Sequence, residues 1–181
     1  MIVDKDAQLF KRVIYPTGAL LEPLKVWRGK DTMQVAGLIK IEYDTAIVKP
    51  KAIYVDVIGL GAGVVDRCRE LSLPVMGINV AESPSVENRY SRMRDELWFE
   101  AREWFARRDV TMPADDGLTA ELTLPSYRVL SNGKLQVESK DEMKSRGVIS
   151  PDLADAFCLT FAKGLPNLSR KPLNYPKRAY A

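Results

Sequence analysis

The most regular hydrophobic pattern in the chain surrounds residue 56. Residues 53–58 form an almost continuous apolar and β-branched run, which predicts a buried strand of the kind found in parallel sheets. Asp56 interrupts that run. The glycine-rich residues 59–63 predict a sharp turn into a helix, whose apolar positions between 64 and 68 share one face. A bare carboxylate in a core strand costs on the order of several kcal/mol unless it is paired or bound to a cation, so Asp56 needs a partner.

The rest of the pattern predicts an α/β chain. Residues 9–15 and 19–27 predict two antiparallel strands joined by a turn at 16–18, with Pro23 favouring an edge or a bulge. A helix is predicted for residues 32–46, with Asp31-Thr32 at its N-cap. Beyond the Asp56 strand, the pattern predicts a strand at 75–80, helices at 86–108, 118–122 and 140–146, a hairpin at 127–138 around Asn132-Gly133, and a last helix that begins at Pro151 with Ser150 as its cap.

Length and composition narrow the possibilities. The 181 residues fit one domain at 1–164, followed by a basic, proline-rich and flexible tail at 165–181. The two cysteines lie in apolar helical patterns, as expected of buried thiols in a reducing cytosol. No signal-peptide or membrane-spanning pattern occurs, so we expect a cytoplasmic protein with no membrane partner. The absence of histidine excludes His-based triads and HExxH zinc sites, and leaves carboxylates, Lys and Tyr for polar chemistry.

The predicted helix at 86–108 has two possible interpretations. It carries arginines on several faces, among them Arg89 and Arg92, with acidic residues between them. The first interpretation is a solvated amphipathic helix with ion pairs one turn apart. The second is a surface that contacts DNA phosphates. The net charge of +3 is too small to decide between them.

A pair of acids in the last helix is a second candidate for chemistry. Asp152 and Asp155 are three residues apart and share one helical face, so they can present two carboxylates to one point. Asp152 would also suit a helix N-terminus, whereas Asp155 has apolar neighbours. A hard divalent ion such as Mg²⁺ or Mn²⁺ would relieve the repulsion between the acids without needing His or Cys. A dinucleotide site at the glycine turn is disfavoured, since Val64 breaks the required spacing.

Several segments together resemble the C-terminal nuclease domain of phage terminase large subunits, in the ribonuclease H-like superfamily. They are IYVDVIGLGAGVVDRCRELSLPVMGINV, ENRYSRMRDELW, YRVLSNGKLQVESKDEMKSRG and SPDLADAFCLTFA, with WRGKDTM near Trp27. The resemblance implies a mixed sheet, with antiparallel leading strands and then parallel strands, flanked by helices and carrying an extra hairpin near 127–138. It also implies a metal-dependent endonuclease that cuts double-stranded DNA with little sequence specificity during packaging.

The resemblance assigns roles to individual positions. Asp56 and Asp155 are the implied metal ligands, with Asp152 as neighbour and Asp4 as the acid of the first strand, Asp6 being the alternative. Two ions, Mg²⁺ or Mn²⁺, are expected. The residues expected to contact DNA are Lys140, Arg89, Arg92, Lys144 and Arg146, and Glu138 is a weaker site candidate.

The resemblance also implies partners, and two alternative functions stay open beside it. The implied partners are the terminase ATPase motor domain, the small terminase subunit and the portal. No GxxxxGK[ST] motif occurs, so we expect no ATPase activity in this chain. Two alternatives share most of these features. One is a catalytically impaired prophage remnant that binds DNA or assists assembly, and the other is a resolvase-like nuclease that prefers branched DNA.

Overall fold

The computed structural model describes residues 2–3, 6–9, 12–15 and 18–163 of the chain. The strands are β1 (Ile2–Val3), β2 (Asp6–Leu9), β3 (Arg12–Tyr15), β4 (Gly18–Leu21), β5 (Lys25–Arg28), β6 (Ile53–Asp56), β7 (Val75–Ile78), β8 (Val110–Thr111), β9 (Tyr127–Val129) and β10 (Leu135–Val137). The helices are α1 (Thr32–Thr45), α2 (Gly61–Glu70), α3 (Met93–Ala106), α4 (Asp116–Thr123), α5 (Lys140–Ser145) and α6 (Asp152–Cys158), followed by a short 3₁₀ turn, η1 (Leu159–Phe161).

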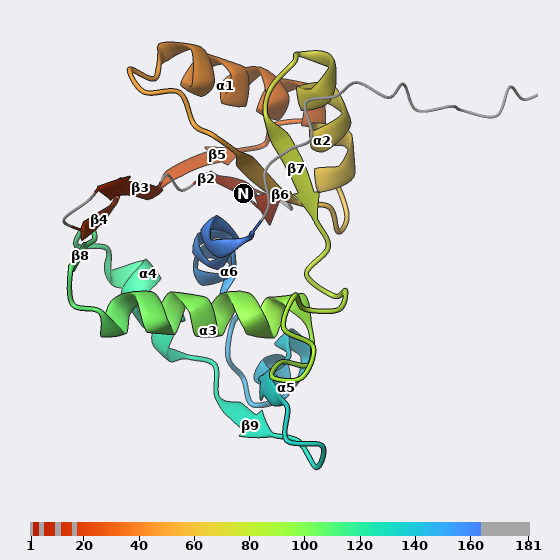
Figure 1. The fold of residues 1–181 in the computed structure, drawn as a ribbon. Coiled ribbons are helices and arrows are strands. Elements are labelled where there is room, and N and C mark those ends of the chain that lie inside the picture. Colours follow the sequence, from red (N-terminus) through yellow and green to blue (C-terminus); the bar gives the residue numbers. More distant parts are fainter. Residues whose placement is uncertain (1, 4–5, 10–11, 16–17, 164–181) are drawn as a thin grey trace, which may run out of the picture.

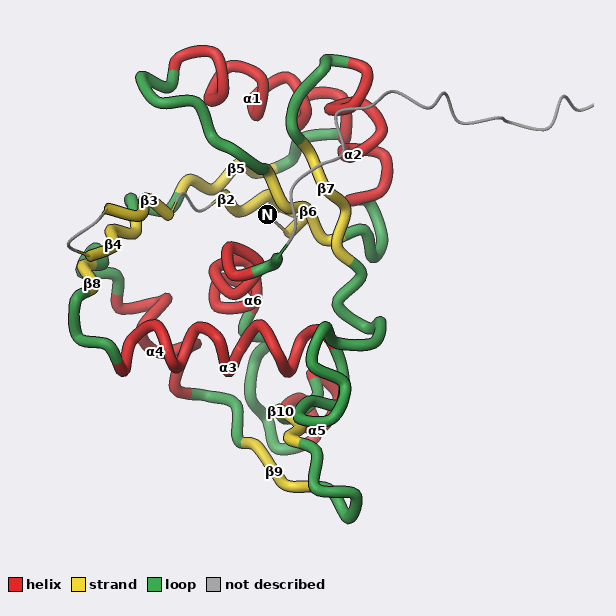
Figure 2. Tube along the Cα trace, viewed as in Figure 1, coloured by secondary structure: helices red, strands yellow, loops and turns green. Residues whose placement is uncertain are grey.

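Strands β2, β5, β6 and β7 lie between two groups of helices, whereas β9 lies beyond α3 (Figure 1). Helices α1 and α2 cover one side, while α6 lies on the other side, between the strands and α3. Each side has its own apolar core. Val35, Val55 and Val64 are fully buried between the strands and α1 and α2, whereas Trp104 and Phe157 are buried between α3, α6 and the opposite side of the strands. The tube in Figure 2 shows the same layers, with α6 enclosed between strands and helices.

The pairing of the strands confirms the predicted mixed fold. The leading strands pair antiparallel, β1 with β2, β2 with β5, and β3 with β4. The later strands β6 and β7 pair parallel, as do β4 and β8. The predicted hairpin is present as the antiparallel pair β9 and β10, in which Tyr127 faces Val137.

Several boundaries differ from the prediction. Leu9, expected to begin a strand at 9–15, ends β2 instead, and the strand expected at 75–80 ends at Ile78. The single strand expected at 19–27 is two strands, β4 and β5, with Pro23 between them, since proline cannot donate to a ladder. The helix expected from residue 86 begins only at Met93. Ser91 donates its N–H to the carbonyl of Leu135, and Leu135 donates to the carbonyl of Arg89, so this segment pairs with β10 instead of joining the helix.

The start of α6 also differs from the prediction. Pro151 occupies the N-cap, and no side-chain cap comes from α6 itself. Ser150, the expected cap, donates its hydroxyl to the Asp152 carboxylate instead, at 2.6 Å. The cap comes from α4, where the Glu121 carboxylate accepts the N–H groups of Leu153 at 2.7 Å and Ala154 at 3.1 Å.

Some of the predicted residues lie at the ends of the chain, where the structure does not describe them. Asp4 and the tail at 165–181 lie outside the described residues, and the Asp6 side chain is not described either.

Cys68 and Cys158 are buried free thiols, as predicted, and burial raises the pKa of Cys68 to about 11. No helix in the described part of the chain is long and apolar enough to cross a membrane.

Candidate active site

Asp56 lies at the end of β6, not in the middle of a longer strand. Its carboxylate Oδ1 accepts the N–H of Ile58 at 3.0 Å, which turns the chain out of the sheet. The chain then passes so close to itself that a Cβ on Gly61 would lie 1.7 Å from the Asp56 carbonyl oxygen. Burial raises the pKa of the Asp56 carboxyl, and the nearby charge of Asp155 acts in the same direction, while the Ile58 N–H and the Lys140 ammonium oppose them.

Asp155 is the second acid of the site, and it is only 8% exposed. Helix α6 carries it against α3, and two α3 side chains bond to it. Trp98 donates its indole N–H to Oδ1 at 2.7 Å, and Arg94 donates Nε–H to the same oxygen at 3.0 Å. Arg94 and Trp98 are not among the site residues predicted from the sequence. Their spacing of four residues, which places them on one helix face, is the one local signal that points to them.

Lys140 joins the two acids of α6. Its ammonium group lies 3.1 Å from Asp155 Oδ2 and 2.9 Å from Asp152 Oδ1. Burial acts to lower the pKa of Lys140, but the Asp155 and Asp152 carboxylates outweigh it and raise that pKa, which stabilises the charged form. The positively charged side chain of Lys140 therefore lies beside both the Asp152 and the Asp155 carboxylates.

Asp56 and Asp155 line the same pocket, which has a volume of about 530 Å³. Helix α3 supplies Arg94 and Trp98 to its wall, and α5 supplies Lys140. One face of the β9–β10 hairpin forms another wall through Arg128 and Gln136. Acids from a strand and a helix thus meet basic side chains in one cavity.

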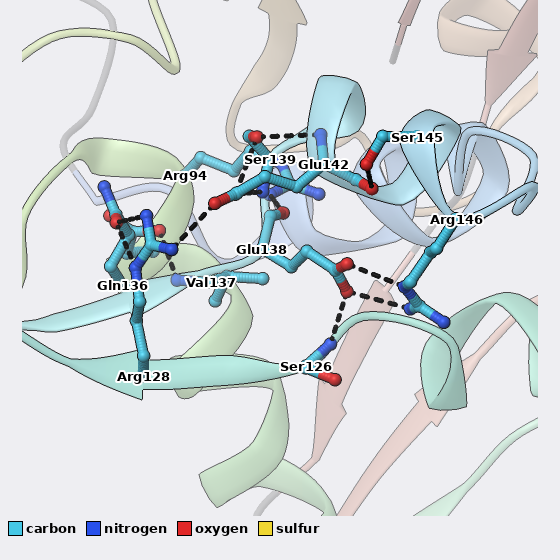
Figure 3. Close-up of polar contacts among 11 residues, drawn as sticks. Arg94, Ser126, Arg128, Gln136, Val137, Glu138, Ser139, Glu142, Ser145 and Arg146 are labelled. Carbon is cyan, nitrogen blue, oxygen red and sulfur yellow. Dashed lines mark hydrogen bonds and ion pairs between the residues drawn. The ribbon is translucent and has the colours of Figure 1, made fainter.

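The hairpin wall is fixed by a network of polar contacts (Figure 3). Arg128 donates to Gln136 and, at 2.7 Å, to the Glu142 carboxylate of α5. Arg94 donates Nη1–H to the Glu138 carbonyl at 2.8 Å. The buried Asp95 carboxylate accepts the N–H of Val137 at 2.8 Å. The adjacent residues Arg94 and Asp95 therefore tie the hairpin to α3 beside Asp155.

The residues predicted to contact DNA are spread around this site. Arg92 and Lys140 line the pocket. Arg89 lies over the ring of Tyr90, with its guanidinium 5.2 Å from the ring centroid. Lys144 is exposed on α5. Arg146 makes a two-point contact with Glu138, at 2.7 and 2.8 Å, so both of these residues support the base of the hairpin.

The carboxylate oxygens in the pocket are ligands of the kind that a hard divalent ion prefers. Asp56 and Asp155 bring carboxylate oxygens, which Mg²⁺ and Mn²⁺ accept, to one pocket. The raised pKa of Asp56 shows that burial disfavours its charge, and a cation would offset this cost. Within the described residues, no group of three or more His, Cys, Asp or Glu side chains is placed to hold an ion.

The fold is similar to that of solved nuclease domains of phage large terminase subunits. The nuclease domain of the large terminase subunit of bacterial virus Sf6 has a TM-score of 0.62 and 20% identity, over 85% of this chain and 86% of that one. A lysine-to-alanine variant of that domain with manganese has a TM-score of 0.61 and 21% identity, over 77% of this chain and 78% of that one.

The fold is also similar to that of a terminase nuclease from a second phage. The large terminase nuclease of thermophilic phage G20c with bound magnesium has a TM-score of 0.54 and 15% identity, over 78% of this chain and 68% of that one. No protein-family model matches the chain, and no curated protein matches it in sequence. The likeness is one of structure, and it confirms the predicted resemblance at the level of the fold.

Proposed function

We propose that this chain is a metal-dependent endonuclease domain of a phage DNA-packaging terminase, which hydrolyses phosphodiester bonds of double-stranded DNA with little sequence specificity. The observation that carries the proposal is the meeting of Asp56 and Asp155 in one pocket with Lys140, on a fold shared with terminase nucleases. The ATPase motor domain, small subunit and portal are its proposed partners in the host cytoplasm, and they follow from the shared fold alone.

The side chains of the pocket have distinct proposed roles. Asp56 and Asp155 would hold the ions, with Asp152 near them and Asp4 as the proposed acid of the first strand. Two bound divalent ions would supply a nucleophilic water and neutralise charge on the phosphodiester. Lys140 holds Asp155 and Asp152 in place through its ammonium group, at 3.1 and 2.9 Å. Arg92 and Arg128 face the pocket, where they can bind DNA phosphates.

Cleavage of a supercoiled plasmid tests this proposal. We expect nicked and linear products with Mg²⁺ or Mn²⁺, and none with EDTA. Asp56→Asn and Asp155→Asn should each lower the rate by at least about a hundredfold, since each removes a charged ligand from the site. Asp66→Asn is the matched control, because Asp66 is a 52%-exposed acid of α2 that pairs only at the surface with Arg69.

The outcomes separate the proposed function from its alternatives. Normal cleavage by both pocket variants would contradict the site. DNA binding without any metal-dependent cleavage by the wild-type protein would favour an assembly module. A strong preference for a four-way junction over the plasmid would favour a resolvase-like nuclease.

A further inference from the structure

The two oxygens of the Asp155 carboxylate have different surroundings. Oδ1 accepts two hydrogen bonds from α3, one from Trp98 Nε1 at 2.7 Å and one from Arg94 Nε at 3.0 Å. Oδ2 lies 3.1 Å from the Lys140 ammonium group. The carboxylate is therefore held in one orientation by donors from two elements.

The bonds to Oδ1 occupy that oxygen. A carboxylate oxygen has about two lone-pair positions, and Trp98 and Arg94 take both of them on Oδ1. Arg94 is only 15% exposed, and its Nη1 is fixed by the Glu138 carbonyl at 2.8 Å. The guanidinium also lies 5.4 Å from the centroid of the Trp98 ring. An ion that enters the pocket is thus left with Oδ2, which keeps one lone-pair position beside its contact with Lys140.

Coordination through one oxygen discriminates between ions. Ca²⁺ takes about 6–8 oxygens at roughly 2.3–2.6 Å and readily accepts both oxygens of one carboxylate. Mg²⁺ requires a nearly octahedral shell at about 2.0–2.1 Å and is suited to one oxygen from each carboxylate. A carboxylate whose second oxygen is withheld therefore favours Mg²⁺ over Ca²⁺.

We infer that Trp98 and Arg94 determine which ion the site prefers, by holding Asp155 Oδ1 and limiting Asp155 to one-oxygen coordination. This inference rests on the proposed function, because it assumes that Asp155 is a metal ligand. It assigns a role to the face of α3 that packs against α6, beyond its contribution to the core.

The test compares Trp98→Phe with Trp104→Phe. Trp98→Phe keeps an aromatic ring and removes the N–H that bonds Oδ1. Trp104 is 1% exposed, and its indole N–H has no hydrogen-bond partner among the residues that the structure describes, so Trp104→Phe changes the core without removing a hydrogen bond seen there. Dissociation constants for Mg²⁺ and Ca²⁺ are obtained from the rise in unfolding temperature with each salt, at constant ionic strength.

The preference of the site between the two ions should move toward Ca²⁺ when Asp155 Oδ1 loses its hydrogen bond from Trp98. For Trp98→Phe, the ratio of the Mg²⁺ to the Ca²⁺ dissociation constant should rise by about tenfold, the effect of one hydrogen bond to a charged group. Trp104→Phe should leave the ratio within about twofold of wild type, because it removes no such bond. If the role of Trp98 were purely structural, Trp98→Phe would weaken the binding of both ions equally and leave the ratio of the dissociation constants unchanged.

An unchanged ratio in a folded Trp98→Phe protein overturns the inference. Near-ultraviolet circular dichroism without metal establishes folding, and Arg94→Lys replaces Trp98→Phe in the same comparison if the latter does not fold. Failure of the wild-type protein to bind either ion would instead contradict the proposed function. The two failures are therefore distinguishable.

Discussion

Asp56 and Asp155 face one pocket from two differently built halves of the molecule. The Asp56 half consists of β6, β7, α1 and α2, and its acid is placed by backbone geometry and one N–H donor. The Asp155 half consists of α3, α4, α5 and α6, and its acid is placed by side chains from α3 and α5. Local chain geometry governs the first half, and contacts between distant residues govern the second.

Gly61→Ala should have the largest effect, and it should act on the Asp56 half. The new Cβ would lie 1.7 Å from the Asp56 carbonyl oxygen, so strand or helix must move. We expect the free energy of unfolding to fall by about 3 kcal/mol or more, as measured by urea denaturation. Gly63→Ala is the control, because its nearest neighbour would be Thr32 Cγ2 at an ordinary 3.5 Å. Equal stability of the two variants would contradict this account of the turn.

Glu121→Ala should have the next largest effect, and it should act on the Asp155 half. It removes the carboxylate that accepts the N–H groups of Leu153 and Ala154, at a helix start that has no cap of its own. Loss of a cap costs about 1–2 kcal/mol of unfolding free energy, and DNA cleavage should fall as α6 loosens. Glu121→Gln retains an acceptor oxygen and should recover at least half of the loss. An Ala variant as stable as wild type would show that α6 needs no cap from α4.

Glu96→Gln should have a smaller, pH-dependent effect in the same half. Burial would raise the pKa of Glu96, but hydrogen bonds from Ser85, from the Val86 N–H and from Lys163 outweigh it and lower that pKa below its ordinary value. The stabilisation by the charged form is therefore complete above the unfolded-state pKa and is lost as the pH falls through the folded-state pKa.

The measurement is the difference in unfolding free energy between wild type and Glu96→Gln at two pH values. At pH 6 the wild type should be more stable by about 1 kcal/mol. The difference should shrink by pH 3. A difference that is constant or grows on acidification would contradict the assigned pKa direction. Glu70→Gln, on an exposed pair with Arg67, is the control and should change stability by less than about 0.5 kcal/mol at either pH.

The same contrast explains what the sequence could predict. The Asp56 strand, the glycine turn, the 127–138 hairpin and helix α1 follow from local patterns, and the structure has all of them. The start of α3 and the cap of α6 could not be predicted locally, because Leu135 pairs with residues 89–91 and Glu121 reaches residues more than 30 positions away. Trp98 and Arg94 were missed as site residues for the same reason, since only the packing of α3 on α6 brings them to Asp155.

In the proposed site, Asp56 and Asp155 share a divalent ion. The most direct test is a crystal of the protein soaked in Mn²⁺, with the ion located by its anomalous scattering. We expect a peak in the pocket within about 2.2 Å of an oxygen from each carboxylate, with Asp155 contributing one oxygen only. A pocket without a peak at saturating Mn²⁺, or a peak that neither acid contacts, would contradict the account.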